Sequence, residues 1–223
     1  GPGAFQEIDQ ASAFEAVTAW SQTVLHDSSH AELMTLATKH AIVERGVSHL
    51  IFPDEVQILE AAEDAAPSGP EGRMADVAIT PDAQSVGKAL DRIRNAKRPA
   101  IIVGHGAGES MDQVIALAEK LNAPVMTTFK AKGQIADDHP LAAGVLGRSG
   151  TPIASWFMNE ADLLIVFGAS FANHTGIEAA KPIIQVDFDR LTLGKFHPTE
   201  VPVWGEIGTT VGLFLASLSE VDT

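Results

Sequence analysis

The stretch RPAIIVGHGAGESMDQVIALAEKLNAPVMTTFKAKGQIADDHP, residues 98–140, predicts an α/β fold. An apolar, β-branched run at 100–103 is typical of a buried strand, and a glycine-rich turn follows it at 103–108. The pattern then predicts a helix over about 109–121 and a second strand over 124–128. Strand, helix and strand in this order are typical of a parallel sheet. The glycine turn could hold a phosphate, or it could only close a tight corner.

The rest of the chain after residue 81 continues this alternation. We predict helices over about 82–96, 152–160 and 207–219, and strands over 163–167, 182–186 and 201–203. Thr80 and Pro81 are predicted to cap and open the first of these helices. Residues 128–151 read as a loop with a short helix. The strands are almost continuously apolar, as expected when both faces of a parallel sheet are buried. The pattern therefore predicts a Rossmann-like α/β domain over 81–223, with a roughly six-stranded parallel sheet and helices on both faces.

The first part of the chain predicts only a partial α/β segment. Within 1–57 we expect a helix at about 9–17, a strand near 19–25, a helix that begins after Ser28 or Ser29 and stops at Gly46, and a strand over 47–53. Two strands and two helices are too few for an independent domain. Residues 60–76 are rich in Ala, Pro, Gly and acid, so we assign 58–80 as a linker.

Composition narrows the possible functions. The chain has 223 residues, 45% of them hydrophobic, a net charge of −14 and no cysteine. The acidity argues against nucleic-acid binding, and no apolar run is long enough to span a membrane. The lack of cysteine and of an export leader favours a cytoplasmic protein. No serine-hydrolase, P-loop or zinc-enzyme motif occurs, so we predict no catalytic residue and no metal ligand. We predict that Trp20, Trp156 and Trp204 are core residues.

Glycines cluster where the apolar strands end. VGHGAG at 103–108 and FGAS at 167–170 each follow a strand, and GVLGRSGT at 144–151 precedes a helix. In an open α/β sheet, ligands bind outside the carboxyl ends of the strands. A helix that starts near Thr151 would direct free amides at an anion, with Arg148 nearby. Asp187 and Asp189 end another strand and could accept hydrogen bonds from a ribose, or could merely cap the turn at 190–194.

The same segments resemble the thiamine-diphosphate-dependent enzymes that act on 2-oxo acids, especially acetolactate synthases and pyruvate oxidases. GPGAFQE at 1–7 and ERGVSHLIFPDEVQ at 44–57 are similar to parts of the family's pyrimidine-binding domain. RPAIIVGHGA, the run from LNAPVMTTFK to LGRSGT, ADLLIVFGASF and IIQVDFDRLTLGKFHPTEVPVWGEI are similar, in order, to its central domain. The resemblance implies that 1–57 is the end of the first domain, that 81–223 is the central domain, and that the chain is a fragment.

The resemblance also implies cofactors and partners. Thiamine diphosphate and Mg would be held in the full-length parent, since neither the metal-binding GDG motif nor the activating glutamate is found here. The parent would be a homodimer or homotetramer. In flavin-containing relatives the central domain holds FAD. The matching residues here are Gly104, His105, Gly106, Ala107, Thr127, Thr128, Gly147, Arg148, Gly150, Gly168, Ala169, Asp187 and Asp189. Ser170 departs from the synthases, which have an arginine there, so one guanidinium contact to a flavin dinucleotide is lost.

Two alternatives to a decarboxylase or carboligase fragment remain open at this point. The chain could be a stand-alone module that binds a nucleotide such as FAD or ADP, with the glycine turns as its site. It could also be a structural spacer without a ligand, in which the glycines serve only the turns. Binding of a nucleotide separates these two alternatives.

Overall fold

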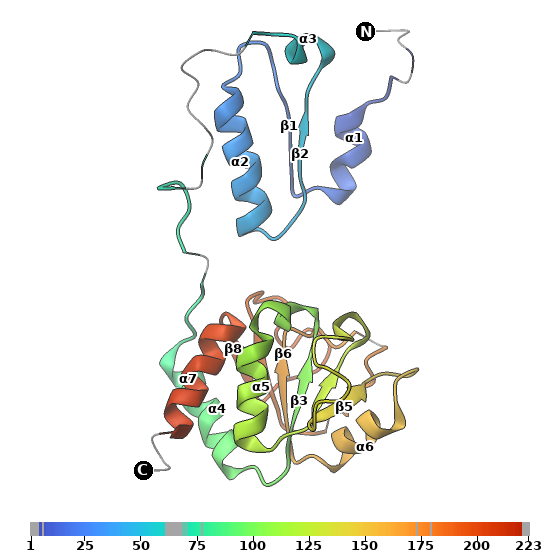
Figure 1. Ribbon diagram of the computed structural model, residues 1–223, viewed down its shortest axis with the longest axis vertical. Coiled ribbons are helices and arrows are strands. Elements are labelled where there is room, and N and C mark those ends of the chain that lie inside the picture. The colour runs from blue at the N-terminus through green and yellow to red at the C-terminus, as the bar shows by residue number, and fades with distance from the viewer. Residues whose placement is uncertain are drawn as a thin grey trace. The chain divides into compact units, whose positions relative to one another are not determined.

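The computed structural model describes residues 5, 7–60, 69, 71–76, 78–172, 174–178 and 180–219 (Figure 1). The chain forms two compact units, residues 1–77 and 78–223. Much of the linker predicted at 58–80 lies outside the described residues, and the predicted domain boundaries remain a prediction. None of the helices in the described part is long and apolar enough to cross a membrane.

The second unit is built on a parallel sheet of six strands, which confirms the predicted fold class. The strands are β3 (Pro99–Val103), β4 (Val125–Thr127), β5 (Ala142–Val145), β6 (Leu163–Phe167), β7 (Ile183–Asp187) and β8 (Val201–Trp204). Their order in the sheet is β5-β4-β3-β6-β7-β8, and every neighbouring pair is parallel. Both faces of the central strands are buried, which explains their continuous apolar sequence.

Helices cover the two faces of this sheet unequally. On one face α4 (Ala83–Asn95), α5 (Met111–Leu121) and α7 (Ile207–Ser219) pack on alternate residues of the strands, such as Ile101 and Ile165. On the other face α6 (Pro152–Glu160) packs on the intervening residues, such as Ile102 and Val166. Figure 1 shows α4, α5 and α7 side by side, with α6 apart from them. Loops cover much of the α6 face.

The strand order reverses direction between β3 and β6. The chain runs from β3 outward through β4 to β5, returns through α6, and then runs outward again from β6 through β7 to β8. Val103 pairs with Phe167 at the carboxyl ends of the two central strands. Since β3 and β6 are neighbours whose chains depart to opposite sides, this is the topological switch point where open α/β sheets bind ligands.

Three predictions about elements were wrong. The run predicted as a loop at 128–151 contains β5, preceded by the 3₁₀ turn η3 (Phe129–Ala131). Helix α4 is capped by Asp82, whose carboxylate accepts hydrogen bonds from the amides of Gln84 and Ser85, and Thr80 is not the cap. Trp156 is 55% exposed, and Trp20 and Trp204 are only half-buried, so the prediction that all three are core residues was wrong.

The first unit is a small, incomplete layer of secondary structure. Two parallel strands, β1 (Trp20–Thr23) and β2 (Ser48–Ile51), lie beside α2 (His30–Val43). Shorter elements flank them: α1 (Gln10–Phe14), the 3₁₀ turn η1 (Glu15–Val17) and α3 (Asp54–Gln57). Among its described hydrophobic residues, only Val24, Ala37 and Val56 are buried. Many large apolar side chains are exposed, including Phe5, Ile8, Val17, Leu25 and Ile58.

Candidate functional site

A cleft of about 480 Å³ lies over the carboxyl ends of β4, β3, β6 and β7, at the switch point of the sheet. The structure brings together there the following predicted site residues: Gly104, His105, Gly106, Thr128, Gly168, Ala169, Asp187 and Asp189. The other predicted residues do not line the cleft: Ala107, Thr127, Gly147, Arg148 and Gly150. Ala107 and Thr127 are buried beneath it. The location of the cleft is the one that parallel-sheet geometry predicts.

The central glycines bring two backbone turns into direct contact. A Cβ atom added to Gly104 would lie 2.1 Å from the carbonyl oxygen of Gly168, and one added to Gly168 would lie 2.6 Å from the carbonyl carbon of Gly106. Gly168 also has a φ of +60°, which side chains rarely adopt. These glycines are therefore required for packing the turn after β3 against the turn after β6.

The amides of these turns are already engaged within the protein. The Gly104 amide donates to the carbonyl of Phe167 at 2.8 Å, and the Gly106 amide donates to the carbonyl of Gly168 at 3.2 Å. The Gly168 amide donates to the carbonyl of Val186 at 3.1 Å. These amides do not provide the free anion cradle that a strand-to-helix glycine turn suggests. The 3₁₀ turn η2 (His105–Ser110) also separates the glycines from the start of α5. An anionic group in the cleft would therefore not be held by the amides of Gly104, Gly106 and Gly168.

The turn at 147–150 does not line the cleft; it packs behind Phe129 and His174, which do. Gly147 has a φ of +143°, and a Cβ there would lie 2.7 Å from the Phe129 ring and 2.8 Å from the carbonyl oxygen of His174. The Arg148 amide donates to that same carbonyl at 3.0 Å. The Thr151 amide donates to the carbonyl of Val145 at 2.8 Å, so these two amides are bonded within the protein, and neither Arg148 nor Thr151 lines the cleft.

Several lining residues were missed from the sequence. The lining residues that are not among the predicted site residues are Phe129, Lys130, Ser170, Phe171, Ala172, His174, Thr175, Phe188 and Thr192. Phe129 and Lys130 follow β4 directly, so the rule that parallel strands end at one edge could have found them. Phe171 has a φ of +56° although it is a bulky residue, and it is buried beside the cleft. Such strain occurs mainly where the surrounding structure imposes it, often at functional sites.

The side chain of Gln185 connects the two loops that form walls of the cleft. It is a buried residue on β7, 1% exposed. Its amide nitrogen donates to the carbonyls of Ala169 at 3.0 Å and Thr192 at 3.3 Å, and its amide oxygen accepts from the Gly194 amide at 2.9 Å. One side chain thus holds the loop after β6 and the loop after β7. The sequence signal was a polar residue inside an otherwise apolar strand.

The two strand-end acids differ in their surroundings. Asp187 is buried, 6% exposed, and accepts a hydrogen bond from the Asp189 amide at 2.9 Å. Asp189 is exposed, and its carboxylate accepts from the Leu191 amide at 2.9 Å and from the Thr192 hydroxyl at 3.0 Å. Asp189 thus performs the turn-capping role that was one of its two interpretations. Asp187, at the floor of the cleft, is the better placed of the two to contact a ligand.

Comparison with known proteins identifies the family. Residues 86–214 match the central domain of the thiamine pyrophosphate enzymes, and this match covers more than half of the chain. The chain belongs to the thiamine pyrophosphate enzyme family. The stand-alone module and the ligand-free spacer are therefore not favoured. The matched residues include all six strands of the sheet described above, and the assignment agrees with the resemblance seen in the sequence.

Individual relatives of this thiamine pyrophosphate enzyme domain agree with the assignment. Over 93% of its length, the chain is 32% identical to acetolactate synthase isozyme 1 large subunit of Escherichia coli. The matched region covers 37% of that protein. Over 97% of its length, the chain is 25% identical to pyruvate oxidase of Lactiplantibacillus plantarum. The matched region covers 36% of that protein. A solved structure from Mycobacterium smegmatis, described as a thiamin diphosphate-dependent enzyme, has the same fold, with a TM-score of 0.73, 23% identity, and coverage of 96% of this chain and 41% of the other. The chain spans a little more than a third of these relatives' length.

The described residues of this thiamine pyrophosphate enzyme domain do not fit a metal–diphosphate site. They contain no group of three or more His, Cys, Asp or Glu side chains that could hold a metal ion. The cleft contributes two carboxylates, Asp187 and Asp189, and both accept hydrogen bonds from the loop that follows β7. No step of thiamine chemistry is therefore assigned to these residues.

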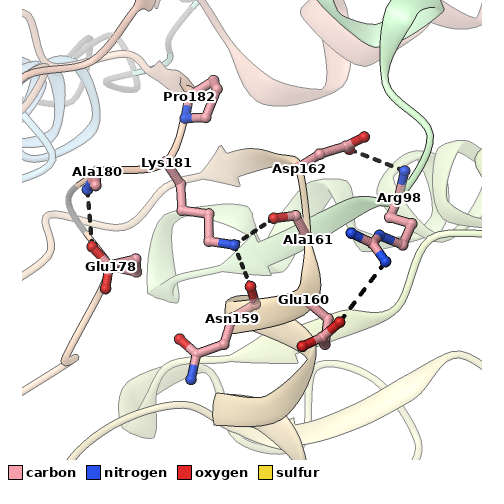
Figure 2. A pocket seen from close by; sticks show the side chains of 9 residues that line it. All are labelled: Arg98, Asn159, Glu160, Ala161, Asp162, Glu178, Ala180, Lys181 and Pro182. Atoms are coloured by element: carbon pink, nitrogen blue, oxygen red, sulfur yellow. Dashed lines mark hydrogen bonds and ion pairs between the residues drawn. The ribbon is translucent and has the colours of Figure 1, made fainter.

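A second, more open hollow of about 900 Å³ lies at the opposite edge of the same sheet, where β3, β6 and β7 begin (Figure 2). Its charged groups secure the end of α6. Lys181 Nζ donates to the carbonyls of Asn159 and, at 2.7 Å, Ala161, and Arg98 lies 3.8 Å from Glu160. Because these charged groups bond to neighbouring protein groups and the hollow is broad and shallow, we assign it a structural role.

Asp162 fixes the entry to β3 at this edge. Its carboxylate accepts from the amides of Lys97 at 2.8 Å and Arg98 at 3.0 Å. Burial acts to raise the pKa of Asp162, but the amides of Lys97, Arg98 and Asp162 and the positive charge of Arg98 together outweigh it, so its pKa lies below the ordinary value of 3.8. The carboxylate thus joins the segment before β6 to the segment before β3.

Proposed function

We propose that the complete enzyme decarboxylates or carboligates 2-oxo acids such as pyruvate. The support is family membership and the names of its relatives, an acetolactate synthase and a pyruvate oxidase. In this proposal 81–223 is the central domain, 58–80 is a linker and 1–57 is the end of the pyrimidine-binding domain. Assay of the full-length protein with pyruvate, thiamine diphosphate and Mg²⁺ tests it. Carbon dioxide release or acetolactate formation is expected, and no turnover of any 2-oxo acid would contradict it.

The complete enzyme would contain thiamine diphosphate and Mg²⁺ at residues outside the cleft described here, and the thiazolium would supply the carbanion chemistry. We expect it to be a homodimer or homotetramer. The absence of cysteine supports a reducing compartment such as the cytoplasm. Light scattering of the full-length protein tests the assembly, and a monomer at micromolar concentration would contradict it.

Within this enzyme we propose that the central cleft binds an adenine nucleotide, FAD or ADP. The observation that carries the proposal is the position of the cleft over β3 and β6, where the order of the sheet reverses. Lys130, His105 and His174 line the cleft and supply donors for phosphate oxygens. Ser170, in place of the arginine of the synthases, weakens the case for FAD relative to ADP.

Thermal-shift measurements with FAD, ADP, NAD and coenzyme A test this proposal, together with absorbance near about 450 nm for a retained flavin. We expect at least one adenine nucleotide to raise the melting temperature. Ala172→Trp, on the exposed rim of the cleft, should abolish the shift, whereas Ala180→Trp, at the opposite hollow, should preserve it. Equal shifts in both variants, or no shift with any nucleotide, would overturn the proposal.

A further inference from the structure

The charged groups of the cleft are separated along the sheet edge. Lys130 follows β4, His105 follows β3, and His174 lies in the loop after β6, so the donors occupy one end. Asp187 and Asp189 follow β7 and occupy the other. These five are the ionisable side chains that line the cleft in the described part of the chain. A phosphorylated nucleoside would therefore lie with its phosphates toward β4 and β3 and its sugar toward β7.

The end of the cleft near β7, where the sugar would lie, has the Asp187 carboxylate at its floor. Asp187 is buried at the last position of β7, where it is rigidly held by pairing with β8. A carboxylate can only accept hydrogen bonds, so it suits the hydroxyls of an unsubstituted ribose. A 2′-phosphate at the same place would bring a second negative group against Asp187 and Asp189, and this like-charge contact would weaken binding.

The arginine next to this end is not directed into the cleft. The guanidinium carbon of Arg190 lies 3.6 Å from the centre of the Trp204 ring, in a cation–π contact. Trp204 is itself fixed by its indole N–H, which donates to the carbonyl of Phe188 at 2.7 Å. Arg190 does not line the cleft, so it is not placed to neutralise a 2′-phosphate, the role that an arginine plays in nucleotide sites of that kind.

We propose that the cleft selects nucleotides with a free ribose 2′-hydroxyl and rejects 2′-phosphorylated ones, with Asp187 as the specificity-determining residue. This inference rests on the proposed nucleotide site and adds the chemical class that it accepts. Calorimetric titration with ADP and with 2′-phosphoadenosine 5′-diphosphate tests it. We expect the second compound to bind roughly tenfold to a hundredfold more weakly, as like-charge contacts in a binding site require.

Variants distinguish this mechanism from a steric one. Asp187→Asn keeps the shape of the side chain and removes its charge, so the difference in affinity between the two ligands should become smaller. Asp189→Asn, on the exposed turn, should reduce this difference in affinity less. Asp189→Asn also keeps the test valid if the buried variant does not fold. Arg190→Ala should leave the difference in affinity unchanged, because the Arg190 guanidinium packs on the Trp204 ring.

The outcomes separate this inference from the proposal on which it depends. Binding of neither ligand overturns both. Equal binding of the two ligands overturns the selectivity and leaves the nucleotide site intact. Weaker binding of the 2′-phosphorylated ligand to Arg190→Ala than to the unsubstituted protein would show that Arg190 reaches the phosphate, and would also overturn the selectivity mechanism.

Discussion

At the scale of single residues, Gly104 shows why a glycine can be required without touching a ligand. Its missing side chain lets the turn after β3 meet the backbone after β6. We predict that Gly104→Ala lowers the free energy of unfolding by about 1–3 kcal/mol, the usual effect of overpacking, because the backbone on the other side cannot move freely. Urea unfolding followed by circular dichroism measures this.

Gly87 provides the matched control for this prediction. It lies inside helix α4, and an added Cβ would meet nothing within 4 Å. Gly87→Ala should therefore raise stability by about 0.5–1 kcal/mol, since alanine loses less backbone entropy in a helix. Loss of stability of the same size in both variants would contradict the close contact at Gly104.

Asp162 gives a prediction for the effect of pH. Its folded pKa is depressed, so its stabilisation is fully present above the ordinary pKa of 3.8 and is lost as the pH falls through the folded value. Asp162→Asn should therefore lower the melting temperature near neutral pH and reduce its dependence on pH between about 5 and 3. Glu160→Gln, on the exposed neighbour, is the control. An unchanged acid profile in Asp162→Asn would contradict the role of the two amide donors.

At the scale of elements, Gln185 couples the loops that follow β6 and β7. We predict that Gln185→Leu lowers the free energy of unfolding by about 1–3 kcal/mol, because the Gly194 amide and two carbonyls lose their buried partner. Amide hydrogen exchange at Thr192 and Gly194 should accelerate more than at β3. Gln84→Leu, an exposed glutamine in α4, should change neither quantity. Unaltered exchange at these loops in Gln185→Leu would show that they are held by other contacts.

The sequence predicted those elements whose hydrophobic pattern is strong. The central strands and α4, α5, α6 and α7 follow from apolar runs and helical periodicity. Strand β5 was missed because Ala142, Ala143 and Gly144 have weak strand propensity, and its place at the edge of the sheet was set by pairing with β4.

The candidate site was predictable only in part, for a similar reason. Strand-end glycines and acids marked the edge of the sheet where the cleft lies, because parallel strands end together. The sequence could not show that the Gly104 and Gly106 amides are bonded to the turn after β6, since that contact joins residues some 60 positions apart in the chain. It also could not separate a ligand role from a capping role for Asp189.

At the scale of the whole molecule, the two units differ in how well they are buried. The first unit has few buried hydrophobic residues and the second has a core on each face of its sheet. We predict that the first unit unfolds at a lower temperature than the second, because hydrophobic burial is the main stabilising term. Calorimetry should show two transitions.

Tryptophan fluorescence assigns these transitions. Trp20 lies in the first unit, and Trp156 and Trp204 lie in the second. In a variant with Trp156→Phe and Trp204→Phe, the remaining signal should follow the low-temperature transition alone. A single transition reported by both Trp20 and circular dichroism would contradict independent unfolding.

The reversal between β3 and β6 also has a consequence for biosynthesis. The walls of the cleft come from both halves of the sheet, from the turn at Gly104 and from the loop that reaches Thr192. On the proposed nucleotide function, a ribosome would have to release the chain at least as far as Thr192 before the cleft could take up its ligand. Newly made chains would complete the scaffold of β3, β4 and β5 first, and binding of the proposed nucleotide would be among the last events of their maturation.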